Sequence, residues 1–175
     1  WSIPEPKIHS DSQSQSYREI LLHGFSQIRH NPVIRTLALD SVVVASAAYF
    51  VVWFYQPYMS SLGISLIYFG LAHAGLLLSE IVVSSNFAFF ERFLGVGKAY
   101  LRNSAILVTL SFILAGLYPS IISLIILITV GGGIGYTRAT YSSSIANKHI
   151  KSAHRATILS SIGMIRRLSL VILNP

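Results

Sequence analysis

The chain has no cysteine and few charged residues. Only 11% of its 175 residues are Asp, Glu, Lys or Arg, against about 25% in an average soluble domain. The missing cysteines exclude disulfides, thiolate metal sites and cysteine nucleophiles. A soluble domain needs a polar surface that so few charges do not supply, and 53% of the residues are hydrophobic. Together these features exclude an ordinary soluble enzyme and indicate an integral protein of the lipid bilayer.

The motifs of common catalytic sites are also missing. The sequence contains no Gly-x-Ser-x-Gly, no His-Glu-x-x-His and no spaced cluster of metal ligands. The glycines within 131–135 lack the Lys-Ser/Thr of a phosphate-binding loop and lie inside an apolar run, so they indicate close helix packing or a flexible point. We therefore expect no enzyme activity, no cofactor and no metal.

Long apolar runs, by contrast, fill most of the chain. Because about 20 apolar residues cross a membrane, we expect five spans, at residues 33–55, 64–87, 99–117, 120–141 and 156–175. The uncharged stretch 103–137 is too long for one crossing, and Tyr118-Pro119-Ser120 divides it into two. Residues 56–63 are predicted to form a turn. The predicted fold class is all-α, a polytopic transmembrane helix bundle of about five spans at residues 33–175.

The first 32 residues differ from the rest. Residues 1–32 are predicted to form a polar cytoplasmic linker with an amphipathic helix at about 17–30, where apolar residues recur at helical spacing. Asn31-Pro32 ends this helix. Since the chain starts at Trp1 and stops inside an apolar run, we expect it to be a piece of a longer protein.

Lysine and arginine are distributed unevenly along the chain. Apart from Arg166 and Arg167 inside the fifth predicted span, they lie near the N-terminal segment or near the loops 88–98 and 142–155, and the turns after spans one and three have none. The positive-inside rule predicts that residues 1–32 and both loops are cytoplasmic. The expected location of the protein is the plasma (inner) membrane. The net charge of +7 is explained in this way, so we expect no nucleic-acid partner.

Several motifs resemble the C-terminal half of a major facilitator superfamily transporter. Tyr55-Gln56-Pro57-Tyr58, followed by Gly63-Ile64, resembles the QPY…GI end of helix seven in many bacterial members. Arg155-Ala156-Thr157-Ile158-Leu159-Ser160 resembles the RATxLS that opens helix eleven, and Asn174-Pro175 falls where a Gly-Pro pair often lies. Glu91-Arg92-Phe93-Leu94-Gly95 is a degenerate form of the acidic-Arg-Gly loop between helices eight and nine. The resemblance covers nearly the whole chain.

The resemblance implies that the spans are helices seven to eleven of a bacterial drug or metabolite exporter, with helix nine peripheral to the transport path. It implies a secondary active transporter, working by alternating access. Its partners would be a small-molecule substrate, a coupling ion (a proton, as in an antiporter) and the N-terminal six-helix half of the same protein. Sugar or organic-anion uptake stays open. The alternatives are a non-transporting structural or assembly subunit and a membrane-embedded enzyme.

Three ionisable side chains inside the spans are candidates for proton coupling. Glu80 leads, because a carboxylate inside a span must face protein or water; a structural ion pair near the cytoplasmic gate is its alternative. His73 lies about 10.5 Å earlier on the same helix face, with a packing histidine as the alternative. Asp40 is the third candidate, and its alternative is a structural pairing with Arg35 or Arg155.

A polar and aromatic stripe in the first span is a candidate for the substrate path. Ser46, Tyr49, Trp53 and Gln56 recur at offsets 0, 3, 7 and 10, which places them on one helix face. Tyrosine, tryptophan and glutamine suit an amphiphilic substrate through stacking and hydrogen bonding. An aromatic belt at the outer membrane surface is the alternative.

Five arginines complete the candidate set. Arg166 and Arg167 lie about 15 Å into the last span and point about 100° apart. Either one, if it faces the cavity, favours an anionic substrate; an interfacial position for both is the alternative. Arg92, Arg138 and Arg155 are assigned to the cytoplasmic gate and loops, and anchoring at the membrane interface is the simplest role for Arg138.

Overall fold

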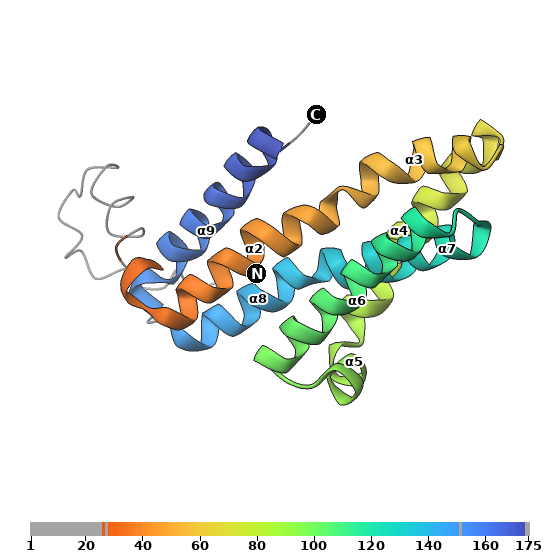
Figure 1. The fold of residues 1–175 in the computed structure, drawn as a ribbon. Helices are drawn as coiled ribbons and strands as arrows, with labels where there is room; N and C mark the ends of the chain where they lie inside the picture. The colour runs from red at the N-terminus through yellow and green to blue at the C-terminus, as the bar shows by residue number, and fades with distance from the viewer. Residues whose placement is uncertain (1–25, 27, 151, 174–175) are drawn as a thin grey trace, which may run out of the picture.

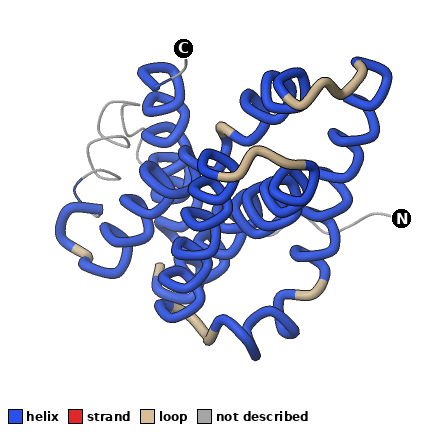
Figure 2. Tube along the Cα trace, turned by 45° about the vertical axis from the view of Figure 1, so that its right-hand side comes forward, coloured by secondary structure: helices blue, strands red, loops and turns tan. Residues whose placement is uncertain are grey.

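The computed structural model describes Ser26, residues 28–150 and residues 152–173. This part of the chain forms helices joined by short loops, and no residue in it belongs to a strand (Figure 2). The prediction of an all-α bundle is confirmed. Of the amphipathic helix predicted at 17–30, only Ser26 and residues 28–30 fall within the described part, and these are helical; the rest of it, and of the linker before it, lies outside.

The long helices run beside one another in an elongated bundle, in which α9 packs against α2 (Figure 1). In chain order the elements are α2 (Pro32–Tyr49), α3 (Val51–Ser61), the short 3₁₀-helix η1 (Leu66–Tyr68), α4 (Phe69–Ser85), α5 (Phe87–Leu94), α6 (Lys98–Leu117), α7 (Ile121–Ile126), the π-helix η2 (Leu127–Ile134), α8 (Gly135–His149) and α9 (Ser152–Leu173).

Four helical stretches in the described part are long and apolar enough to cross a membrane. They are Pro32–Ser61, Leu66–Ser85, Lys98–Leu117 and Ile121–His149, and they coincide with the first four predicted spans. Large apolar side chains such as Val43, Leu71 and Ile122 are exposed on them, as a lipid-facing surface requires. These are the features of an integral membrane protein. The fifth predicted span falls on α9 up to Leu173 and stays a prediction, as does the sidedness of the loops.

The turn predicted at residues 56–63 is wrong in its position. Residues 56–61 continue as α3, and the chain turns only after Ser61. Pro57 lies inside this helix, which membrane helices tolerate because neighbouring groups satisfy the freed carbonyl. Gly63 ends it with a positive φ of 72°, a conformation that glycine adopts without a steric penalty.

Both charged loops are also more helical than predicted. Residues 88–94 of the first belong to α5, because Phe87 and Phe90 pack on the core with helical spacing. In the second, α8 continues to His149. Ser142, Ala146 and Ile150 are buried at intervals of four residues, so one stripe of this polar sequence packs inside the bundle.

The glycine run allows two neighbouring helices to press against η2 and α8. A Cβ on Gly135 would lie 2.6 Å from the Cβ of Ala48 in α2. A Cβ on Gly133 would lie 2.9 Å from the Cβ of Ser79 in α4, and 3.1 Å from the carbonyl oxygen of the same residue. The prediction of close packing at this run is confirmed, and phosphate binding has no support here.

Candidate functional site

A cavity of about 330 Å³ lies between α2, α4, α8 and α9. We call it the central cavity. Ala45 and Tyr49 lie about 20–25 Å along α2 from Pro32, at 1.5 Å per residue, near the middle of the 30-residue helix Pro32–Ser61. Four helices that are distant in sequence thus meet around one space beside the middle of this long helix. The lining residues are Ala45, Tyr49, Glu80, Tyr136, Ala139, Arg166 and Leu170.

Two opposite charges line this cavity. Glu80 comes from α4 and Arg166 from α9, and both side chains are half-buried. Within the described part of the chain the one ion pair is elsewhere, so Glu80 and Arg166 are not paired with each other. A carboxylate and a guanidinium that share a cavity without neutralising each other are both available to a polar ligand or, at Glu80, to a proton.

Stacked tyrosines form another wall of the central cavity. The rings of Tyr49 and Tyr136 are nearly parallel, with centroids 5.9 Å apart and an interplanar angle of 24°. The hydroxyl of Tyr136 donates to the backbone carbonyl of Tyr49 over 3.3 Å. Because tyrosine presents an apolar ring and a polar tip, this wall suits a ligand with an aromatic or amphiphilic body.

The predicted interfacial role of Arg138 is wrong, because its side chain is completely buried. The guanidinium pairs with Asp40 on α2; it also donates to the hydroxyl of Ser104 and to the carbonyl of Leu101 on α6, the latter over 2.6 Å. Ser142 donates to the second oxygen of Asp40 over 3.1 Å. These bonds pair the two charges where α2, α6 and α8 meet, so the cluster joins three helices; the buried Nε of Arg138 has no hydrogen-bond partner among the described residues.

The predicted partners of Asp40 are therefore corrected as well. Arg35 and Arg155 are both exposed, and neither forms the pair that Arg138 makes. Asp40 lies outside the lining of the central cavity. Its bonds to Arg138 and Ser142 leave it a structural role in this arrangement, rather than direct contact with a ligand in that cavity.

His73 is separated from Glu80 although both belong to α4. Its Nδ1 lies 3.5 Å from the hydroxyl of Tyr55, and the side-chain amide of Gln56 donates to the same hydroxyl over 3.0 Å. Tyr55 is buried. The three side chains form a small polar group between α3 and α4, outside the central cavity, so His73 and Glu80 do not line the same cavity.

The other predicted residues take separate positions. Ser46 is fully buried and lies 3.2 Å from the hydroxyl of Ser169 on α9. Trp53 lines a pocket of about 200 Å³ that also includes Tyr49. Tyr49 and Trp53 thus share one pocket, whereas Ser46 lies against α9 and Gln56 bonds Tyr55, so the predicted stripe does not line a single path. Of the predicted site residues, three arginines are exposed and lie outside the lining of the central cavity, namely Arg92, Arg155 and Arg167.

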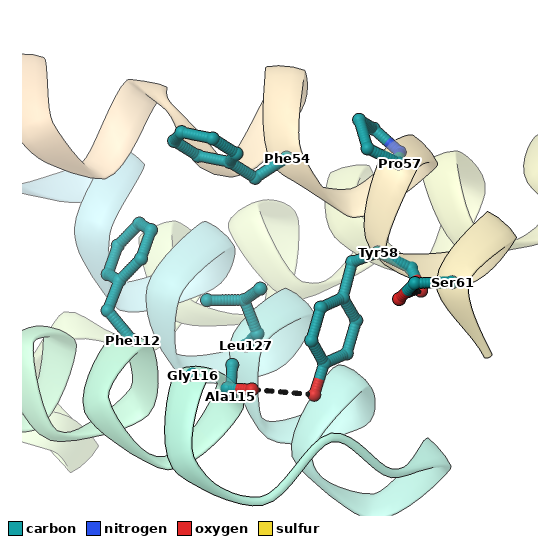
Figure 3. A pocket seen from close by; sticks show the side chains of 8 residues that line it. All are labelled: Phe54, Pro57, Tyr58, Ser61, Phe112, Ala115, Gly116 and Leu127. Atoms are coloured by element: carbon teal, nitrogen blue, oxygen red, sulfur yellow. Dashed lines mark hydrogen bonds between the residues drawn. The ribbon is translucent and has the colours of Figure 1, made fainter.

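A larger pocket of about 410 Å³ lies between α3, α6 and η2. Figure 3 shows Phe54 and Pro57 of α3 on one side and Phe112 of α6 on the other, with no charged side chain among the residues drawn. Its polar contact is the hydroxyl of Tyr58, which donates to the carbonyl of Ala115 over 3.0 Å. Because no acidic or basic side chain lines this pocket, it is a weaker candidate for proton coupling than the central cavity.

The sequence analysis did not identify two tyrosines that make contacts between helices, Tyr136 and Tyr141. Tyr136 directly follows the glycine run, and a signal for it was available, since a polar aromatic residue inside a predicted span needs a partner. Tyr141 bonds Glu91, from which it is separated by 50 positions. No local pattern indicates a contact over that distance.

No group of three or more His, Cys, Asp or Glu side chains in the described residues is arranged to hold a metal ion. In comparisons with protein-family models, with curated proteins and with solved structures, nothing matches this chain.

Proposed function

We propose that the chain is one lobe of a secondary active transporter of the major facilitator type, with the central cavity as its share of the substrate path. The observation that carries the proposal is the unpaired Glu80 and Arg166 in one cavity of a bundle of apolar helices, beside the middle of the helix Pro32–Ser61. Charged residues inside membrane helices mark substrate and ion paths, and transporters bind substrate near the membrane centre.

The two charges take different roles in this proposal. Glu80 accepts and releases the coupling proton, because its carboxylate has no cation bound to it in the described structure. Arg166 binds an acidic group of the substrate, since a guanidinium presents several donors to a carboxylate. The stacked rings of Tyr49 and Tyr136 hold an aromatic or amphiphilic body. The substrate class that fits best is therefore a small aromatic carboxylate.

Replacing Glu80 with glutamine is expected to remove proton-driven transport while the protein still folds. The full-length protein would be reconstituted in liposomes, and uptake of radiolabelled p-aminohippurate would be followed after an imposed pH gradient, with ethidium as a cationic comparison. We expect gradient-driven uptake of p-aminohippurate, reduced at least tenfold by Glu80→Gln, which corresponds to about 1.4 kcal/mol in transition-state free energy.

The two adjacent arginines provide a matched control. Arg166→Gln removes the charge from the cavity and is expected to abolish uptake of the anion, whereas Arg167→Gln removes an exposed charge outside the cavity lining and is expected to leave it unchanged. Equal effects of the two arginine variants, or uptake of neither probe in response to the gradient, would contradict the proposed function.

A further inference from the structure

The surface formed by α5 and the start of α6 combines exposed apolar and basic side chains. We call it the α5 surface. Phe89, Phe93 and Val96 are 54%, 73% and 71% exposed, and the rings of Phe89 and Phe93 lie 5.0 Å apart. The basic side chains of the same segment, all exposed, are Arg92, Lys98 and Arg102. Figure 1 shows α5 at the end of the bundle where α4 stops and α6 begins.

Contacts on the opposite side hold α5 in place. The ring of Phe87 packs against Tyr100 and Tyr141, with centroids 6.3 Å and 5.5 Å away. The hydroxyl of Tyr141 accepts from the backbone N–H of Gly97 over 2.9 Å and donates to Glu91 over 2.5 Å. Because α5 and the following turn are fixed to α8 in this way, the outward direction of Phe89 and Phe93 is part of the fold.

The charge on this surface has little compensation. Glu91 is its one carboxylate, and it already accepts the hydroxyl of Tyr141. Among the described residues no acidic side chain forms an ion pair with Arg92, Lys98 or Arg102. Three exposed cations and a pair of exposed phenylalanine rings therefore lie within residues 89–102, between the α4 span and the first turns of the α6 span.

We propose that the α5 surface binds anionic phospholipids of the adjoining leaflet, with its basic residues at the headgroups and its phenylalanines among the upper acyl chains. Interfacial helices with this composition bind membranes through apolar burial together with attraction to acidic headgroups. The membrane is the favoured partner because the surface continues from the ends of the α4 and α6 spans, whereas a soluble acidic partner leaves the exposed rings unexplained. The proposal does not depend on transport.

The first test compares two triple variants of the full-length protein by native mass spectrometry, with phosphatidylglycerol and phosphatidylcholine as probes. Arg92→Gln, Lys98→Gln and Arg102→Gln remove the charges of the α5 surface. Removing each charge is expected to weaken binding of phosphatidylglycerol about fivefold, and removing all three about 100-fold, with little change for phosphatidylcholine.

The control triple removes three exposed charges from outside the α5 surface, namely Arg29→Gln, Arg35→Gln and Lys148→Gln. It is expected to change phosphatidylglycerol binding less than threefold. If both triple variants weaken phosphatidylglycerol binding equally, the lipid is attracted by the summed positive charge of the protein and not by the α5 surface. The proposal then fails. It fails equally if the α5 triple keeps the preference for phosphatidylglycerol.

The second test uses a tryptophan reporter in lipid bilayers and does not depend on removing charges. In a background with Trp1→Phe and Trp53→Phe, and with any tryptophan outside these 175 residues replaced by phenylalanine, Phe93→Trp is compared with Leu117→Trp, an exposed position at the other end of α6. The bilayers contain equal amounts of the two lipids, one of them brominated in each experiment. Brominated phosphatidylglycerol is expected to quench the Phe93→Trp reporter more than brominated phosphatidylcholine does. The Leu117→Trp reporter is expected to be quenched to the same extent by either brominated lipid. Equal quenching at both positions overturns the proposal, as does protection of Phe93→Trp from both lipids.

Discussion

Replacing Arg138 with glutamine is expected to lower the free energy of unfolding by about 3–5 kcal/mol, the cost of removing one partner of a buried ion pair. The guanidinium is completely buried. Its loss leaves the carboxylate of Asp40, with a side chain only 11% exposed, without its cation. The carbonyl of Leu101 and the hydroxyl of Ser104 lose their donor at the same time. The junction of α2, α6 and α8 is therefore expected to open first.

The double variant Asp40→Asn with Arg138→Gln separates loss of packing from loss of charge pairing. Since neither buried position then carries a charge, the double variant is expected to be more stable than Arg138→Gln alone. Unfolding of the purified protein in mixed micelles gives the free energy of unfolding of the wild type, of Arg138→Gln and of the double variant. Arg35→Gln, on the exposed side of the same helix α2, is the control and is expected to have little effect. If Arg138→Gln is as stable as the wild type, the structural role of the Arg138–Asp40 pair is contradicted.

Replacing Gly135 with alanine is expected to destabilise the bundle by about 1–3 kcal/mol, the usual cost of overpacking. The added Cβ would lie 2.6 Å from the Cβ of Ala48. Both atoms are attached directly to backbone, so no side-chain rotation relieves the contact, and α2 must move away from α8. The Arg138–Asp40 pair joins the same two helices and is expected to weaken with this shift.

Gly116→Ala is the matched control for this effect. A Cβ on Gly116 meets no atom of the described structure within 4 Å, and alanine favours helix more than glycine does. We expect Gly116→Ala to be neutral or slightly stabilising in the same unfolding experiment. A result in which both alanines are equally tolerated would show that α2 and α8 are not packed as closely as described.

The apolar helices could be predicted from the sequence because each depends on local composition. The stretch 103–137 has no charge, and the split at Tyr118-Pro119-Ser120 is found between α6 and α7. The helical segments within the two predicted loops could not be found from local composition. Residues 142–149 are polar overall, and only the packing of Ser142 and Ala146 inside the bundle shows that α8 continues.

Three polar members of the candidate site could be predicted from the sequence, but their arrangement could not. Glu80, Tyr49 and Arg166 each stand out as polar residues inside apolar runs, and the structure brings all three to one cavity. Arg138 stands out equally, yet it pairs with Asp40 over a separation of 98 residues. Which charges neutralise each other and which stay available depends on how the helices pack, and a single sequence carries no local record of that.

The most direct test of the central claim is whether water reaches the central cavity from both sides of the membrane. Because the chain has no cysteine, one cysteine placed by Ala139→Cys in the cavity lining reports on it alone, once any cysteine outside these 175 residues is replaced by serine. Val43→Cys, at an exposed apolar position of α2, is the control. In the full-length protein, we predict that a membrane-impermeant thiol reagent modifies Ala139→Cys from either side of sealed vesicles, and at least tenfold faster than Val43→Cys. Modification from one side only, or no faster than the control, would contradict alternating access through this cavity.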